Sequence, residues 1–124
     1  LENLTYLVEN LPEVSFHIAA KTNVSDRLES FKKYDNVTLY TNVHHDDIIE
    51  DLLDQSEIYL DINHWDQVDS IVDRAFEKGK PVFAFDNVVH RAELGASVFS
   101  HQDPEMMVKA IQRQLFGIAV DTVN

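Results

Sequence analysis

The chain has 124 residues, no cysteine, and a formal net charge of −12 at pH 7. That length corresponds to one domain with a core large enough to fold without covalent cross-links. The lack of cysteine excludes disulfides, thiolate metal sites and cysteine nucleophiles, and it suits a reducing cytosol, so we expect a cytoplasmic protein. The negative charge disfavours nucleic acid and anionic lipid as partners. No apolar run approaches the roughly 20 residues that a membrane-spanning helix needs.

The first half of the chain alternates between helical and extended hydrophobic patterns. Leu4, Leu7 and Val8 recur at the spacing of one helix face, whereas residues 37–40 alternate as in a strand. Two acids at 46–47 stand where a helix dipole favours negative charge. The predicted elements, in chain order, are a helix over 4–11, a strand over 14–20, a short helix carrying Leu28 and Phe31, a strand over 37–40 and a helix from Asp46 to Leu53.

The stretch from Ile58 to Asp86 switches its period from strand to helix and back. An apolar run over 58–62 precedes a helix, Gly79 and Pro81 end that helix, and a second apolar run covers 82–85. Because such a connection crosses over, the two strands must be parallel. The apolar helix face consists of Val68, Ile71, Val72, Ala75 and Phe76.

The last third of the chain is less regular, with a short helix expected over 87–94 and a fifth strand over 96–99. Pro104 suits the first position of a final helix. Short strands separated by helices predict a parallel sheet covered on both faces. We therefore predict one three-layer, Rossmann-like α/β domain over 1–124, with a mostly parallel sheet of about five strands. Since the sequence opens on Leu1 and passes directly into a helix, we expect it to be one domain of a longer protein.

Several common site motifs are absent from the sequence. The first predicted strand is followed by A-A-K-T-N, and three glycines in the whole chain cannot form a dinucleotide fingerprint or a Walker A loop. No serine stands in a G-x-S-x-G elbow. The run 44–47 (H-H-D-D) contains metal-ligating residue types, but adjacent residues rarely converge on one ion. We therefore expect no metal, no NAD-dependent chemistry and no P-loop function.

Polar residues follow the strand over 58–62, at the edge where open α/β sheets bind their ligands. Trp65 either stacks on a base or sugar or covers the end of the sheet. Asp66 either caps the next helix or contacts a ligand. Arg74 lies off the apolar helix face, where it either forms a surface ion pair with Asp69, Asp73 or Glu77, or meets a phosphate.

Three segments resemble the carboxy-terminal, donor-side domain of GT-B-fold glycosyltransferases of group 1 type. They are 36–43 (N-V-T-L-Y-T-N-V), the strand that ends at Asn63, and 74–82 (R-A-F-E-K-G-K-P-V). The likeness covers nearly the whole chain. The phrase 59–64 (Y-L-D-I-N-H) is similar to bacterial glycosyltransferases of accessory secretion systems. Those proteins glycosylate serine-rich adhesins in the cytoplasm, and one member of a pair is a non-catalytic, acceptor-binding chaperone.

The resemblance implies half of a GT-B fold, the C-terminal domain of a two-domain protein, and a UDP-sugar as donor substrate without a further cofactor. Asn42 and Val43 would border the base, Asn63 and Trp65 the sugar, and Arg74 the ribose or a phosphate. No catalytic residue is identified. The full set of implied binding residues is Asn42, Val43, Asn63, His64, Trp65, Asp66 and Arg74.

The chain departs from the family pattern at two places in this region. Arg74 stands where the family has its ribose-binding glutamate, and Gln67, Val68 and Asp69 replace the glycine-rich loop. Two hypotheses follow. The chain is the nucleotide-sugar-binding domain of a glycosyltransferase acting in bacterial protein O-glycosylation, or it belongs to a non-catalytic partner subunit that binds the acceptor protein. Hexosyl transfer is expected only of a full-length protein, because GT-B sites lie between two domains.

Overall fold

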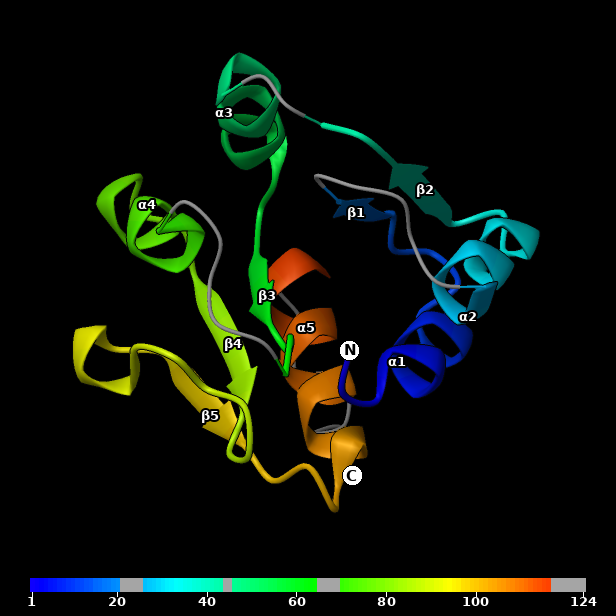
Figure 1. The fold of residues 1–124 in the computed structure, drawn as a ribbon. Helices are drawn as coiled ribbons and strands as arrows, with labels where there is room; N and C mark the ends of the chain where they lie inside the picture. Colours follow the sequence, from blue (N-terminus) through cyan, green and yellow to red (C-terminus); the bar gives the residue numbers. More distant parts are fainter. Residues whose placement is uncertain (21–25, 44–45, 65–69, 117–124) are drawn as a thin grey trace.

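The computed structural model describes residues 1–20, 26–43, 46–64 and 70–116 (Figure 1). Helices and strands alternate along these residues, as predicted. No helix in these ranges is long and apolar enough to cross a membrane. The elements are α1 (Leu4–Asn10), β1 (Phe16–Ala19), α2 (Asp26–Glu29), η1 (Ser30–Lys33), β2 (Val37–Tyr40), α3 (Asp46–Gln55), β3 (Tyr59–Asp61), α4 (Ile71–Glu77), β4 (Val82–Phe85), η2 (Ala92–Leu94), β5 (Ser97–Phe99) and α5 (Pro104–Phe116), where η marks a 3₁₀ helix.

All described strand pairs are parallel, which confirms the predicted fold class. β1 pairs with β2, β3 with β4, and β4 with β5. The five strands nevertheless form two hydrogen-bonded groups, β1–β2 and β3–β4–β5, instead of one continuous ladder. Figure 1 shows β1 set apart from β3.

The helices cover the strands on two sides, with α3 and α4 on one side and α1, α2 and α5 on the other (Figure 1). Side chains of β4 alternate between the two layers, because successive residues of a strand point to opposite faces. Phe83 and Phe85 join a large core cluster with α1 and α5, whereas Val82 joins a smaller cluster with α4. The large cluster contains Leu4, Leu7, Val8, Leu11, Phe16, Phe31, Ile62, Phe83, Phe85, Val88, Met107, Val108 and Ile111.

Left-handed backbone positions set the ends of two elements. Ser70, with φ 54°, precedes α4, so this helix begins at Ile71, later than the apolar spacing predicts. Gly95, with φ 104°, ends the 3₁₀ helix η2, which replaces the helix predicted over 87–94. Glycine suits that position because a side chain is strained at such a φ.

The two adjacent methionines of α5 offer a matched test of the core. Met107 is fully buried and Met106 is 52% exposed. We expect Met107→Ala to lower the free energy of unfolding by about 2–5 kcal/mol, because it leaves a cavity. Met106→Ala, the control, should change it by less than about 0.5 kcal/mol. Urea denaturation measures both, and equal effects of the two substitutions would contradict the assignment of the core.

Candidate functional site

The carboxyl ends of β3, β4 and β5 meet at one edge of the sheet, because the three strands are parallel. In open α/β domains ligands bind at this edge. Here it carries three carboxylate–imidazole pairs, formed with loop residues or with the start of the chain. The pairs are Asp61 with His90 (Oδ1–Nδ1 2.6 Å), Asp86 with His101 (Oδ1–Nδ1 2.7 Å) and Glu2 with His64 (Oε1–Nε2 3.1 Å).

Asp61 is the buried member of this set, with 2% of its surface exposed. His90 makes two hydrogen bonds to its carboxylate, one from the backbone N–H (2.8 Å) and one through the ring Nδ1 (2.6 Å). The next residue, Arg91, holds both carboxylate oxygens of Asp73 on α4 at 2.6 and 2.7 Å. The loop after β4 is therefore fastened to β3 and to α4. The sequence holds one signal of this buried pair: Asp61 is an acid inside an apolar strand, and a buried charge requires a partner.

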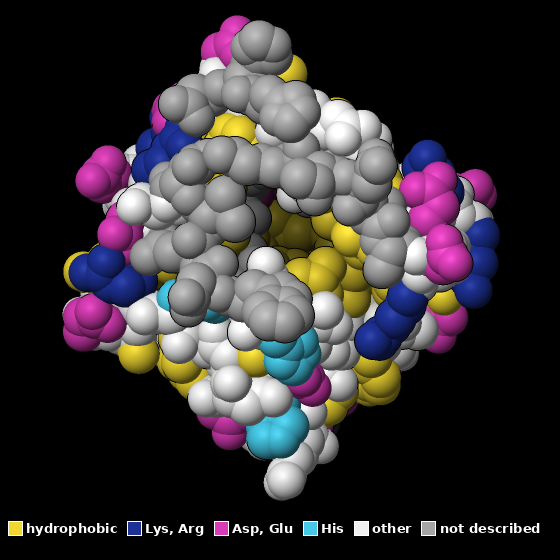
Figure 2. Space-filling view, viewed as in Figure 1, with side chains coloured by type: hydrophobic (Ala, Val, Ile, Leu, Met, Phe, Trp, Pro, Cys, Tyr) yellow, Lys and Arg dark blue, Asp and Glu magenta, His cyan; other side chains and the backbone are white. Residues whose placement is uncertain are grey.

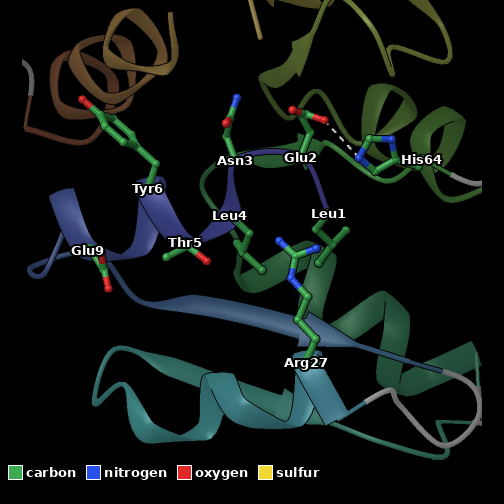
Figure 3. Close-up of a pocket in the computed structure, with 9 residues that line it drawn as sticks. All are labelled: Leu1, Glu2, Asn3, Leu4, Thr5, Tyr6, Glu9, Arg27 and His64. Carbon is green, nitrogen blue, oxygen red and sulfur yellow. Dashed lines mark ion pairs between the residues drawn. The ribbon is translucent and has the colours of Figure 1, made fainter. Parts of the chain in front are cut away.

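A cavity of about 470 Å³ opens beside this edge, between the start of the chain and α2 (Figure 3). The imidazole of His64 closes one end, paired with Glu2. The guanidinium of Arg27 extends from α2 toward Leu1 and Leu4. The lining residues are Leu1, Glu2, Asn3, Leu4, Thr5, Tyr6, Glu9, Arg27 and His64.

The charged groups of this cavity are mostly engaged with protein partners. Glu9 accepts a hydrogen bond of 2.6 Å from the hydroxyl of Tyr34, and this bond raises the pKa of Tyr34. Glu2 is engaged by His64. Within the described part of the chain, the Arg27 guanidinium makes no hydrogen bond or ion pair. The cavity can therefore offer one cation to an anionic or polar group.

The structure brings some of the predicted site residues to this edge. His64 lines the cavity, and Asn63 precedes it, half-buried, just beyond β3. Asn42 lies exposed beyond β2 in a left-handed conformation, with φ 54°. Val43 is only 6% exposed, and its N–H donates to the carbonyl oxygen of Ala20 at 2.9 Å. Val43 thus lies in the protein interior, whereas Asn42 faces solvent.

Arg74 lies between α3 and α4, outside the lining of the cavity. Its Nε donates to Oε1 of Glu50 at 3.0 Å, and its side chain is 18% exposed. Lys78 also binds Glu50 (2.6 Å) and bridges to Asp54 (2.7 Å). Hydrogen bonds from Lys78 and Arg74 lower the pKa of the Glu50 carboxyl. The structure thus pairs Arg74 with Glu50 of the neighbouring helix α3, a partner that helical spacing along its own helix did not indicate.

Trp65 and Asp66 fall outside the described residues. α4 begins five residues after Asp66, with Ser70 in its cap position. Over the described ranges, no three His, Asp or Glu side chains are grouped so that they could hold a metal ion.

The buried pair at the end of β3 gives a stability prediction. Asp61→Asn removes the charge that His90 binds and replaces one of the two accepting oxygens with a donor, which mismatches one of the two hydrogen bonds. We therefore expect a loss of about 2–4 kcal/mol in the free energy of unfolding. Asp86→Asn, the same change at an exposed carboxylate paired with His101, should cost clearly less. Urea denaturation of both variants at neutral pH measures the difference, and equal losses would refute a special role for the buried pair.

The Glu50 cluster predicts a pH dependence. A carboxyl whose pKa is lowered in the folded state stabilises the fold above its unfolded pKa, which for glutamate is 4.5, and loses that contribution as pH falls through the folded value. Glu50→Gln should therefore lower the urea midpoint at pH 7, and the difference from the parent protein should shrink toward about pH 3. A difference that stays constant with pH would show that Glu50 does not titrate in this way.

The chain spans about a quarter of the length of the curated relatives it matches. It is 40% identical over 114 residues to the UDP-N-acetylglucosamine–peptide N-acetylglucosaminyltransferase stabilizing protein GtfB of Streptococcus agalactiae, covering 90% of this chain and 26% of that protein. It is 43% identical over 110 residues to glycosyltransferase GlyF of Streptococcus pneumoniae serotype 4, covering 87% and 27%.

Solved structures agree with these relatives. Apo glycosyltransferase GlyE of Streptococcus pneumoniae superposes with a TM-score of 0.85 at 32% identity, over 92% of this chain and 30% of that one. A GtfA/B complex bound to UDP and GlcNAc gives a TM-score of 0.83 at 36% identity, over 95% and 27%. The family model of the GftB/GlyA-F C-terminal domain matches residues 1–118 of this sequence. The resemblance stated from the sequence is confirmed, and the chain belongs to the GftB/GlyA-F C-terminal domain family.

Proposed function

We propose that this domain belongs to a non-catalytic partner subunit of a glycosyltransferase complex, and that it helps to bind the acceptor protein in bacterial O-glycosylation. The observation that carries the proposal is the position of Arg74. It replaces the ribose-binding glutamate of the family that the sequence resembles, and Glu50 engages it between α3 and α4. A ribose or phosphate would have to compete with Glu50 for the guanidinium of Arg74.

The charge at the strand ends supports the same proposal. Residues 61–64, 86–88 and 100–103 contain no lysine or arginine, but they contain three aspartates. A nucleoside diphosphate would lie beside these carboxylates, and a dense negative charge is repelled by like charges at short range. A neutral or weakly basic polypeptide meets no such penalty.

The relatives also fit a role that does not require donor binding. The same kind of domain occurs in a relative named as a stabilizing protein and in one named as a glycosyltransferase, at 40% and 43% identity. The domain is therefore compatible with both roles, and the departures at Arg74 and at 67–69 favour the first.

A second candidate is binding of a UDP-sugar, as part of a catalytically competent full-length protein. The cavity favours it, because His64 and the guanidinium of Arg27 lie together beside the carboxyl edge. One cation could neutralise part of a diphosphate, and an imidazole could donate to a sugar hydroxyl.

Calorimetry of the full-length protein separates the two candidates. The titrants are UDP, UDP-GlcNAc and an unglycosylated serine-rich polypeptide. We expect no heat from either nucleotide up to about 1 mM, and saturable binding of the polypeptide.

Nucleotide binding at or below that concentration would overturn the proposal. Its loss in Arg27→Ala would then assign donor binding to the cavity, and its loss in Arg74→Ala would assign it to the family position. Lys109→Ala, an exposed cation on α5, is the control that should change neither titration.

A further inference from the structure

β5 lies at one end of the sheet, because it pairs with β4 on one side and has no strand on the other side in the described part of the chain. Figure 1 shows it at the border of the molecule. The N–H of Asp86 donates to the carbonyl oxygen of Phe99 at 2.8 Å, so Phe99 turns its backbone groups toward β4. Successive residues of a strand direct these groups alternately to its two sides. Val98 therefore turns its N–H and C=O outward, to the surface.

The side chains along this edge are exposed, and they are apolar or small. Leu94 is 42% and Val98 44% exposed, and Gly95 and Ser97 between them are exposed as well. The neighbouring strand β4, by contrast, buries all four of its side chains. Figure 2 shows hydrophobic and uncharged groups at the lower left, over β5 of Figure 1. Apolar groups that gather on one exposed edge are typical of an interaction surface.

The edge of β5 lacks the features that keep other strand edges from pairing. Natural edges usually carry lysine or proline, or are covered by neighbouring chain. Residues 94–100 (L-G-A-S-V-F-S) contain no charged residue and no proline. The end strand β2 is different, because the carbonyl oxygen of Tyr34 already accepts the outward N–H of Val37 at 3.2 Å. The β5 edge is thus the better template for an added strand.

Carboxylates flank this uncharged stretch on both sides. Glu93 precedes it and Asp103 follows it, both exposed, and residues 92–108 contain no lysine or arginine. The preceding cation, Arg91, is shared between Glu93 (2.9 Å) and Asp73 (2.6 Å). A second copy of this chain would bring another net charge of −12 to the edge, and an acidic polypeptide would be repelled in the same way. The charges favour a neutral segment with basic residues at its ends.

We propose that the acceptor polypeptide docks along the outer edge of β5 as an added strand. This inference rests on the proposed function, and it names the surface and the chemistry that would hold an acceptor. Backbone hydrogen bonds to Val98 supply the binding, as in other cases of β-strand addition. The fitting segment has about seven uncharged residues, small or β-branched, to lie along 94–100. Since carboxylates stand at both ends, flanking cations fit whichever way the segment runs.

Docking of this kind has two consequences for an acceptor. It recognises mainly the backbone, so different segments of one long polypeptide can occupy the edge in turn. It also guides the segment, because β5 leads into residues 100–103, beside the Asp86–His101 pair at the strand ends. An added strand would therefore extend onto the edge of the sheet where open α/β domains bind their ligands.

Hydrogen exchange of the full-length protein, with and without a probe peptide, tests the proposal. The probe is the capped peptide K-S-T-S-V-S-T-S-K, which has seven uncharged residues between two lysines. At a peptide concentration that saturates the calorimetric signal, we expect residues 95–100 to exchange about tenfold more slowly and β2 to be unchanged. The matched peptide with glutamate in place of both lysines should bind about three- to fivefold more weakly.

Val98→Pro removes the outward N–H and spares the ladder with β4, because proline is tolerated at a sheet edge. We expect it to weaken peptide binding about tenfold and to change Tm by less than about 2 °C. Glu93→Lys is a second variant that leaves the strand untouched. It should weaken binding of the lysine-flanked peptide about three- to fivefold and strengthen binding of the glutamate-flanked one. Glu13→Lys, the same change at an exposed acid before β1, is the control and should alter neither.

The possible results separate this proposal from the proposed function. Peptide binding without protection of 95–100, or binding that Val98→Pro and Glu93→Lys leave unchanged, would refute docking at β5 alone. No heat from either the peptide or the serine-rich polypeptide would refute the proposed function and this inference together. Slow exchange of 95–100 before any peptide is added, in a dimer that Val98→Pro makes monomeric, would assign the edge to a second copy instead.

Discussion

The parallel ladder on either side of β4 is the constraint on which the described structure depends. β4 has neighbours at both edges and helices over both faces, so its four residues are fully enclosed. Phe83 and Phe85 anchor the α1/α5 layer, and Val82 anchors α4. The same pairing aligns the ends of three strands, which places Asp61 and Asp86 beside the loops that carry their histidine partners.

Local periodicity was sufficient for most elements and for the fold class. The strands over 37–40 and 82–85 and the helix that begins at Pro104 appear within the bounds that the sequence predicts. These elements were predictable because each depends on side chains a few residues apart. The separation of β1 from β3 was not, since it depends on which backbone edges meet in space.

The candidate site was less predictable for the same reason. The ion pair of Arg74 with Glu50 joins residues 24 apart, and that of Asp61 with His90 joins residues 29 apart. No helix or strand period connects such positions. The cation of the cavity, Arg27, lies on the short helix α2. No motif around it in the sequence indicates that it lines a cavity. Periodicity thus located His64 and Asn63 at the correct edge, but it could not identify what they would face.

The fastening of the loop after β4 has a mechanical consequence. His90 and Arg91 are consecutive, yet one is bound to the strand β3 and the other to the helix α4. Displacing either residue strains the other attachment, so the loop resists independent motion. A protein that docks on this rim of the domain would meet a preformed, rigid surface and would lose little conformational entropy in ordering it.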